Sequence, residues 1–147
     1  YRSLVDPDAK LIELLLAADA LRRRGASRLV LVAPYLPYMR QDTAFAPGEA
    51  VSQQVIGRLL SQTFDTVLTV DPHLHRTPDL AAVLPGAITV SAAATIAQAL
   101  HGKLPADTVL IGPDEESRPW VAAVAAPLGL DYLVARKQRH GDHSVTI

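Results

Sequence analysis

The apolar residues near the start of the chain follow a helical period. Asp6 and Pro7 precede this pattern as an N-cap and a first-turn proline, and Gly25 follows it as a stop signal. The pattern therefore predicts a helix over residues 7–24. Its apolar positions are Leu11, Leu14, Leu15, Ala18 and Leu21.

Short apolar runs alternate with further helical patterns along the rest of the chain. A helix marked by Val51, Val55, Leu59 and Leu60 is predicted to end before residue 66. Two more helices are predicted at 92–100 and at 117–128, the latter with Ser117 as N-cap. The apolar runs predict strands at 29–33, 66–70, 88–90, 108–111 and 131–135. Strands that alternate with helices indicate an α/β fold with parallel, doubly wound sheets.

The composition narrows the class of protein. The chain has 147 residues, 49% of them apolar, which is enough for a well-filled core. A net charge of −1 provides no global basic field, so we expect no nucleic-acid partner. No apolar run approaches the ~20 residues of a membrane helix, and the absence of cysteine fits a reducing compartment. We therefore expect a soluble, cytoplasmic protein without a membrane partner.

Polar and charged residues lie where the predicted strands end. The run 34–49 is long for a strand-to-helix connection and carries Arg40 and Gln41. His73 follows the second predicted strand, Asp114 the fourth and Lys137 the fifth. In open parallel sheets the carboxyl ends of the strands form the ligand-binding edge, so this placement predicts a binding site.

Four segments at these strand ends resemble motifs of one enzyme family. They span 34–49, 71–77, 112–117 and 136–142, in the family's order and at about its spacing. The chain resembles the ribose-phosphate diphosphokinases, also called phosphoribosyl pyrophosphate synthetases, over essentially its whole length. The resemblance implies two phosphoribosyltransferase-like domains with doubly wound parallel sheets.

The resemblance also implies a reaction and its ligands. The family transfers the diphosphoryl group of ATP to C1 of ribose 5-phosphate, giving phosphoribosyl diphosphate and AMP. Arg40 and Gln41 match ATP ligands, and His73 and Asp114 match positions that bind Mg²⁺. A homo-oligomer is expected on the same basis, while the role of His75 stays open.

Two cations after the last predicted strand match the catalytic arm of the family. Lys137 corresponds to the catalytic lysine, and Arg139 to a partner that binds ribose 5-phosphate or the transferring group. Residues two apart on an extended segment point to one side, as such an arm requires. The alternative is a basic surface hairpin without a catalytic role.

Structural roles remain open for the other candidates. Arg40 could be a solvated loop arginine paired with Asp42, and His73 could be a structural histidine. Asp114 precedes a helix, where a carboxylate also serves as a cap. Glu49 is interpreted as a helix-start acid and is left out of the predicted site.

The ends of the chain differ from the family pattern. Family members begin with a further stretch that carries a Phe-Pro-Asp-Gly-Glu-like loop, and they continue to a Gly/Thr-rich loop that binds the sugar phosphate. Neither is present, so we expect a fragment with two incomplete domains, 1–84 and 85–147, that is inactive alone. The alternative functions are a non-catalytic synthetase-associated homologue that binds nucleotide, or a phosphoribosyltransferase.

Overall fold

The chain folds into two compact units, Tyr1–Val90 and Ser91–Ile147. The computed structural model describes residues 1–136, 138–139 and 145–146. The division falls six residues after the boundary expected between residues 84 and 85. The physical reason is that the strand at 87–90 pairs with the strand at 66–70, and so belongs to the first sheet.

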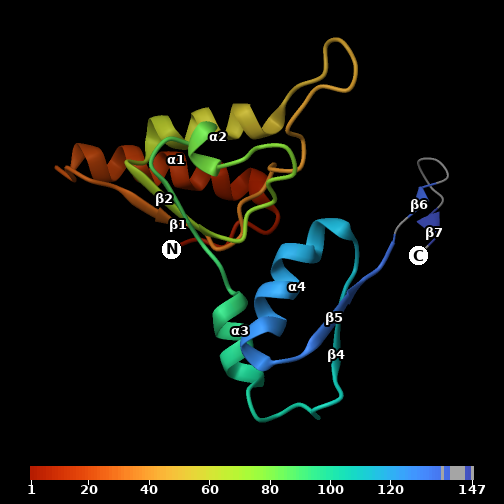
Figure 1. The fold of residues 1–147 in the computed structure, drawn as a ribbon. Coiled ribbons are helices and arrows are strands. Elements are labelled where there is room, and N and C mark those ends of the chain that lie inside the picture. Colours follow the sequence, from red (N-terminus) through yellow and green to blue (C-terminus); the bar gives the residue numbers. More distant parts are fainter. Residues whose placement is uncertain (137, 140–144, 147) are drawn as a thin grey trace. The chain divides into compact units, whose positions relative to one another are not determined.

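The first unit is built around a parallel sheet of three strands in the order β1-β2-β3 (Figure 1). Val30 pairs with Thr66, and Leu68 pairs with Ile88. A helix connects β1 to β2, as parallel pairing requires. The elements are α1 (Pro7–Arg23), β1 (Val30–Val32), α2 (Ser52–Thr63), β2 (Thr66–Val70), the 3₁₀ turn η1 (Leu80–Ala82) and β3 (Ala87–Val90).

The core of the first unit surrounds the central strand β2. Thr66, Val67 and Thr69 are all buried, although neighbouring residues of a strand point to opposite faces. Both faces of β2 are therefore covered, as in a doubly wound sheet. The buried apolar cluster is drawn from the whole unit: Leu4, Leu11, Ala18, Leu29, Leu31, Ala33, Leu36, Met39, Leu60, Phe64, Val67, Leu80 and Leu84.

The second unit has a parallel pair of strands and a short antiparallel pair (Figure 1). Strands β4 and β5 pair in parallel, with Leu110 opposite Tyr132, and β6 pairs antiparallel with β7. The elements are α3 (Ala93–Leu100), β4 (Val109–Gly112), η2 (Glu115–Ser117), α4 (Arg118–Ala125), η3 (Ala126–Leu128), β5 (Asp131–Val134), β6 (Gln138–Arg139) and β7 (Val145–Thr146).

The helix expected at 117–128 is shorter in the structure. Its α-helical part ends at Ala125, and a 3₁₀ turn follows. Pro127 explains the change, because proline has no N–H to donate to the carbonyl four residues earlier. Ser117 sits at the N-cap but makes no side-chain cap bond to α4.

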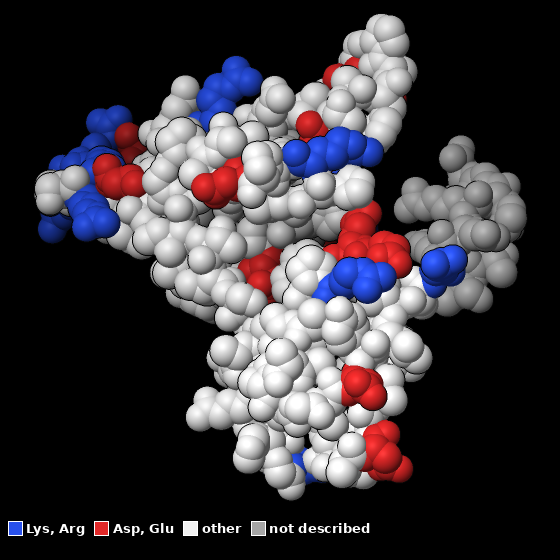
Figure 2. All heavy atoms as spheres, viewed as in Figure 1, with Lys and Arg blue, Asp and Glu red and all other residues white. Residues whose placement is uncertain are grey.

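Positive and negative side chains are intermixed on the face shown in Figure 2. At the end of α1, Arg22 pairs with Asp65, and Arg23 pairs with Asp19. The arginine run there is therefore partly neutralised by neighbouring acids. Among the described residues, no helix combines the length and apolar character needed to cross a bilayer.

Candidate functional site

Two loops begin side by side at the carboxyl edge of the first sheet. We call residues 33–51, between β1 and α2, the long loop, and residues 71–77, after β2, the histidine turn. The N–H of Ala33 donates to Leu68 O at 2.9 Å, and the N–H of Val70 donates to Pro34 O at 3.0 Å. Arg40, Gln41 and His73 therefore lie on loops that leave the same edge of the sheet.

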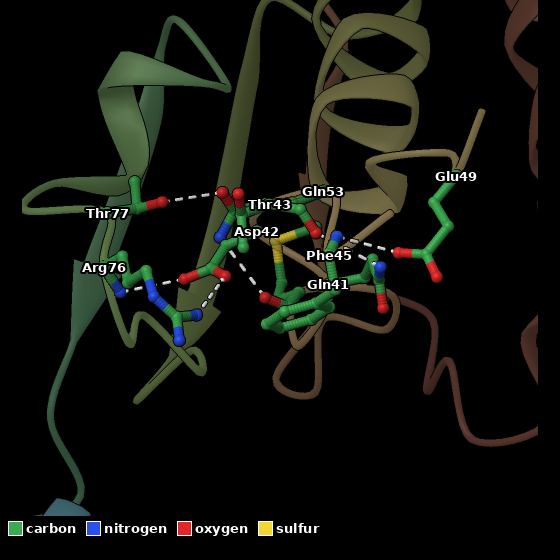
Figure 3. A network of polar contacts seen from close by, with 9 residues as sticks. Gln41, Asp42, Thr43, Phe45, Glu49, Gln53, Arg76 and Thr77 are labelled. Carbon is green, nitrogen blue, oxygen red and sulfur yellow. Dashed lines mark hydrogen bonds and ion pairs between the residues drawn. The ribbon is translucent and has the colours of Figure 1, made fainter. Parts of the chain in front are cut away.

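An ion pair joins the two loops (Figure 3). The Arg76 backbone N–H donates to Asp42 Oδ2 at 2.9 Å, and Arg76 Nη1 donates to Asp42 Oδ1 at 2.8 Å. The Arg76 guanidinium also lies 5.6 Å from the centre of the Phe45 ring, within cation–π range. Asp42 thus pairs with Arg76 of the histidine turn, and not with its near neighbour Arg40.

The Asp42 carboxylate is nearly covered and still charged. Its side chain is 1% exposed, while that of Arg76 is 52% exposed. Burial of the carboxylate acts to raise its pKa, but the hydrogen bonds from the Arg76 N–H and guanidinium, together with the Arg76 charge, act to lower it. The net result is a pKa of Asp42 below its ordinary value.

Helix α2 supplies a second connection between the loops. The Gln53 side chain is buried; its Nε2 donates to Met39 O at 3.3 Å, and its Oε1 accepts from Thr77 Oγ1 at 2.7 Å. The Gln53 backbone N–H donates to Gln41 O at 3.1 Å. One residue at the start of α2 therefore contacts both loops, as Figure 3 shows.

The outer part of the long loop is held by Glu49. Its carboxylate accepts from the N–H groups of Phe45 and Ala46, at 2.8 and 3.2 Å (Figure 3). Helix α2 begins only at Ser52. Glu49 thus binds loop backbone instead of capping the helix start, which corrects the interpretation from sequence.

Both loops contain a residue with an unusual backbone. Tyr38 has φ = 63° and Asp71 has φ = 40°, each two positions before a predicted site residue. Such angles cost on the order of 1–3 kcal/mol for residues other than glycine and concentrate at functional sites. The Tyr38 hydroxyl donates to the Asp8 carboxylate, and that hydrogen bond, burial and the Asp8 charge raise the pKa of Tyr38.

Arg40 and Gln41 lie in different surroundings. Arg40 is exposed, and no hydrogen bond or ion pair of its side chain occurs within the described part of the chain. Gln41 is half-buried, and its Nε2 donates to Thr43 O at 3.2 Å. A guanidinium in this position can bind phosphate through paired N–H bonds, and an amide can pair with a purine edge.

The predicted metal ligands do not form an all-protein cage. Across residues 1–136, no three His, Asp or Glu side chains come together as a metal cluster. His73 is half-buried, and its ring lies 6.5 Å from that of His75, centre to centre. Mg²⁺ in phosphate sites is bound by oxygen atoms and keeps several waters, so the His73 ring fits such an ion as a partner of a metal-bound water.

Asp114 in the second unit caps the turn η2. Its Oδ1 accepts from the Ser117 N–H at 3.2 Å, and Ser117 Oγ accepts from the Asp114 N–H at 3.4 Å, which completes a capping box. The capping alternative raised by the sequence is therefore realised. A carboxylate has lone pairs beyond the one used here, so the cap leaves room for a further ligand.

The two predicted catalytic cations lie at the end of the chain. Lys137 is outside the described residues. Arg139 belongs to β6, which pairs antiparallel with β7.

Two residues important for this arrangement were missed by sequence reasoning. Arg76 stands 34 positions from Asp42, so no local pattern reveals their pairing. Gln53 did leave a signal, because Gln53, Gly57 and Leu60 share the buried face of α2 at helical spacing. A polar side chain on a buried helix face indicates a specific hydrogen-bonding role.

Comparison with known proteins tests the resemblance found in the sequence. Residues 2–63 match the model for the N-terminal domain of ribose phosphate pyrophosphokinase. A ribose-phosphate pyrophosphokinase of Methanopyrus kandleri is 36% identical over 141 residues, which is 95% of this chain and 48% of that protein. The Thermococcus kodakarensis protein of the same name is 37% identical over 133 residues, 90% of this chain and 46% of that protein. Over nearly its whole length, this chain is similar to ribose-phosphate pyrophosphokinases.

A solved structure of the family has the same fold. The phosphoribosylpyrophosphate synthetase of Mycobacterium smegmatis aligns with a TM-score of 0.73 and 28% sequence identity, over 88% of this chain and 44% of that one. The predicted α/β class with parallel sheets is thus confirmed. The chain spans about half the length of the relatives it matches.

Proposed function

We propose that this chain forms part of a magnesium-dependent ribose-phosphate diphosphokinase. In this reaction the C1 oxygen of ribose 5-phosphate bonds to the β-phosphorus of ATP, and the bond from that phosphorus to the oxygen shared with the α-phosphate breaks. The hydroxyl proton is released, and the products are phosphoribosyl diphosphate and AMP. The main support is that Arg40, Gln41 and His73 lie on two loops that leave the same edge of the sheet. In addition, the chain is about a third identical to proteins named ribose-phosphate pyrophosphokinase.

Each residue has a role that its chemistry supports. The exposed Arg40 guanidinium would bind ATP phosphate, and Gln41 would contact the base. His73 in the first unit and Asp114 in the second would contact Mg²⁺ at separate positions, and bound Mg²⁺ would neutralise phosphate charge. Such phosphoryl chemistry depends mostly on positioning the reactants and on neutralising charge. Loops anchored at the edge of a rigid sheet can position the reactants.

Lys137 and Arg139 would stabilise charge that develops as the diphosphoryl group moves. We further propose a cytoplasmic homo-oligomer without a nucleic-acid partner, in keeping with the net charge of −1 and the absence of cysteine.

Steady-state kinetics test this function in a polypeptide that carries the sequence. AMP should form only when ribose 5-phosphate and Mg²⁺ are both present. Lys137→Ala should lower kcat by about 10²- to 10³-fold, the usual cost of losing one such electrostatic contact, with a smaller effect on the KM for ATP. A normal kcat with only a raised KM would contradict the catalytic role, and a requirement for a nitrogenous base would indicate a phosphoribosyltransferase.

A further inference from the structure

We propose that Arg76 is a positioning residue that holds Arg40 and Gln41 ready for nucleotide. It does so by fixing the long loop through Asp42 and Phe45. The inference rests on the proposed function, because it assigns Arg76 to the same nucleotide site. The inference adds Arg76 to the site as a residue that contacts the long loop and does not contact the reacting atoms.

The contacts of Arg76 define the orientation of Asp42. Its backbone N–H and its guanidinium each occupy a different oxygen of the carboxylate, at 2.9 and 2.8 Å. A carboxylate held at both oxygens by one residue can neither rotate nor shift without losing a charge-assisted bond. Because Asp42 directly follows Gln41 in the chain, its position limits where Arg40 and Gln41 can lie.

The burial of Asp42 makes this contact consequential. The carboxylate side chain is 1% exposed, so the charge of Arg76 compensates its loss of water. A buried carboxylate without its cation must protonate, find another partner or move to solvent. Each of these outcomes would change the conformation of the segment that carries Arg40 and Gln41.

The same guanidinium reaches a second point of the loop. Its distance of 5.6 Å from the Phe45 ring places it against an aromatic face that is 71% exposed and gains little packing from the core. Arg76 thus contacts the loop at Asp42 and again three residues later (Figure 3). Two contacts from one side chain restrain the direction of the loop as well as its distance from the histidine turn.

The chain offers a conservative variant and a matched control. Arg76→Lys keeps the charge but loses the planar fork, and Arg76→Gln removes the charge. Arg23→Gln is the control, because Arg23 is another exposed arginine that forms an ion pair, with Asp19, outside the two loops. The Arg23–Asp19 pair is exposed on both sides, so Arg23→Gln should melt near the temperature of the parent protein. Arg76→Gln leaves the buried Asp42 carboxylate without its cation and should melt somewhat lower, so loop order and binding are compared well below the melting temperature of every variant.

Two measurements separate positioning from general stability. Hydrogen exchange of the peptide covering residues 40–50 reports the order of the loop without ligand. Titration with Mg-ATP reports the affinity. Arg76→Gln should speed exchange in this peptide and weaken Mg-ATP binding by roughly 2- to 30-fold, the range for residues that act on a site without touching the ligand. In both the exchange rate of this peptide and the affinity for Mg-ATP, Arg76→Lys should lie between Arg76→Gln and the parent protein. Arg23→Gln should match the parent protein in both.

The outcomes distinguish this inference from the proposed function. An Arg76→Gln variant that binds Mg-ATP as the parent does would overturn the inference, whatever its exchange rate. A parent protein that binds no Mg-ATP would overturn the proposed function and the nucleotide part of the inference together. In that case hydrogen exchange still tests whether Arg76 orders the long loop. Faster exchange of residues 40–50 in Arg76→Gln supports this role, and unchanged exchange rejects it.

Discussion

Asp65 shows how a single carboxylate connects three elements of the first unit. Its Oδ2 accepts from the Leu29 N–H at 2.7 Å and from Arg22 Nη2 at 2.5 Å. The end of α1, the approach to β1 and the approach to β2 therefore meet at one side chain. The Leu29 N–H and then the Arg22 guanidinium hold the pKa of Asp65 below its ordinary value, against a smaller opposing effect of burial.

This lowered pKa predicts a specific dependence of stability on pH. A carboxyl group whose pKa is lower in the folded state stabilises the fold above its unfolded pKa of about 3.9, and that stability is lost as the pH falls through the folded value. Asp65→Asn should lower the urea midpoint at pH 7 and should reduce the difference between the midpoints at pH 7 and pH 3. Asp131→Asn, an exposed acid of the other unit, is the control. An Asp65→Asn variant with the full acid dependence of the parent would contradict this account.

At the level of residues, the sequence located the candidate site better than it predicted the contacts. Arg40, Gln41 and His73 follow directly from counting past the ends of apolar runs. The partner of Asp42 did not, because sequence proximity favoured Arg40 while the fold brings Arg76 to it. Ion pairs between distant segments depend on which strands are neighbours, and a single sequence does not state that order.

At the level of elements, the packing of α2 depends on a glycine. A Cβ built on Gly57 would lie 2.2 Å from the carbonyl oxygen of Val83, a backbone atom that cannot rotate away. The helix therefore packs against the segment before β3 with no space for a side chain at this position. That close approach also places Gln53, one turn earlier, next to the loops of the candidate site.

Gly57→Ala tests this packing because two effects oppose each other. In an unhindered helix, alanine is more favourable than glycine by about 1 kcal/mol. Here the clash with Val83 should dominate, with a net loss of about 1–3 kcal/mol in the free energy of unfolding. Chemical denaturation measures the difference, and Gln54→Ala on the exposed side of α2 is the control. A more stable Gly57→Ala variant would show that the helix does not pack this closely.

Most elements were predictable to within one or two residues. The predicted helix at 7–24 is α1 (Pro7–Arg23), and the strand at 66–70 matches β2. These boundaries could be predicted because proline and glycine bracket the first helix and because the strand is a largely buried, continuous apolar run. The turn η1 was not predicted, because three residues are too few to establish a period.

At the level of the whole molecule, the two units differ in the core that they bury. All residues of the large apolar cluster lie in the first unit. Of the described residues in the second unit, the buried apolar ones are only Ala93, Ala97 and Ala125. Ile111 and Leu133, which are paired neighbours on β4 and β5, are 70% and 62% exposed.

This difference predicts unequal local stability. Burying a large aliphatic side chain contributes about 1.5–3 kcal/mol, so three alanines supply far less than the leucines and valines of the first unit. Amide hydrogen exchange should be slower in β2 than in β4 and β5 when measured on the intact chain. Equal protection of β2 and β4 would mean that contacts other than this core stabilise the second unit.

The central claim is that the long loop and the histidine turn together bind the phosphates of a nucleotide, and NMR titration with Mg-ATP tests it most directly. The account predicts saturable shifts of the Arg40 and Gln41 amides and of the His73 ring, while the exposed ring of His101 in the second unit stays unchanged. Arg40→Ala should weaken the response, and Arg24→Ala, an exposed arginine at the end of α1, should not. Absence of saturable shifts in both loops, or equal responses of the parent and Arg40→Ala, would contradict the account.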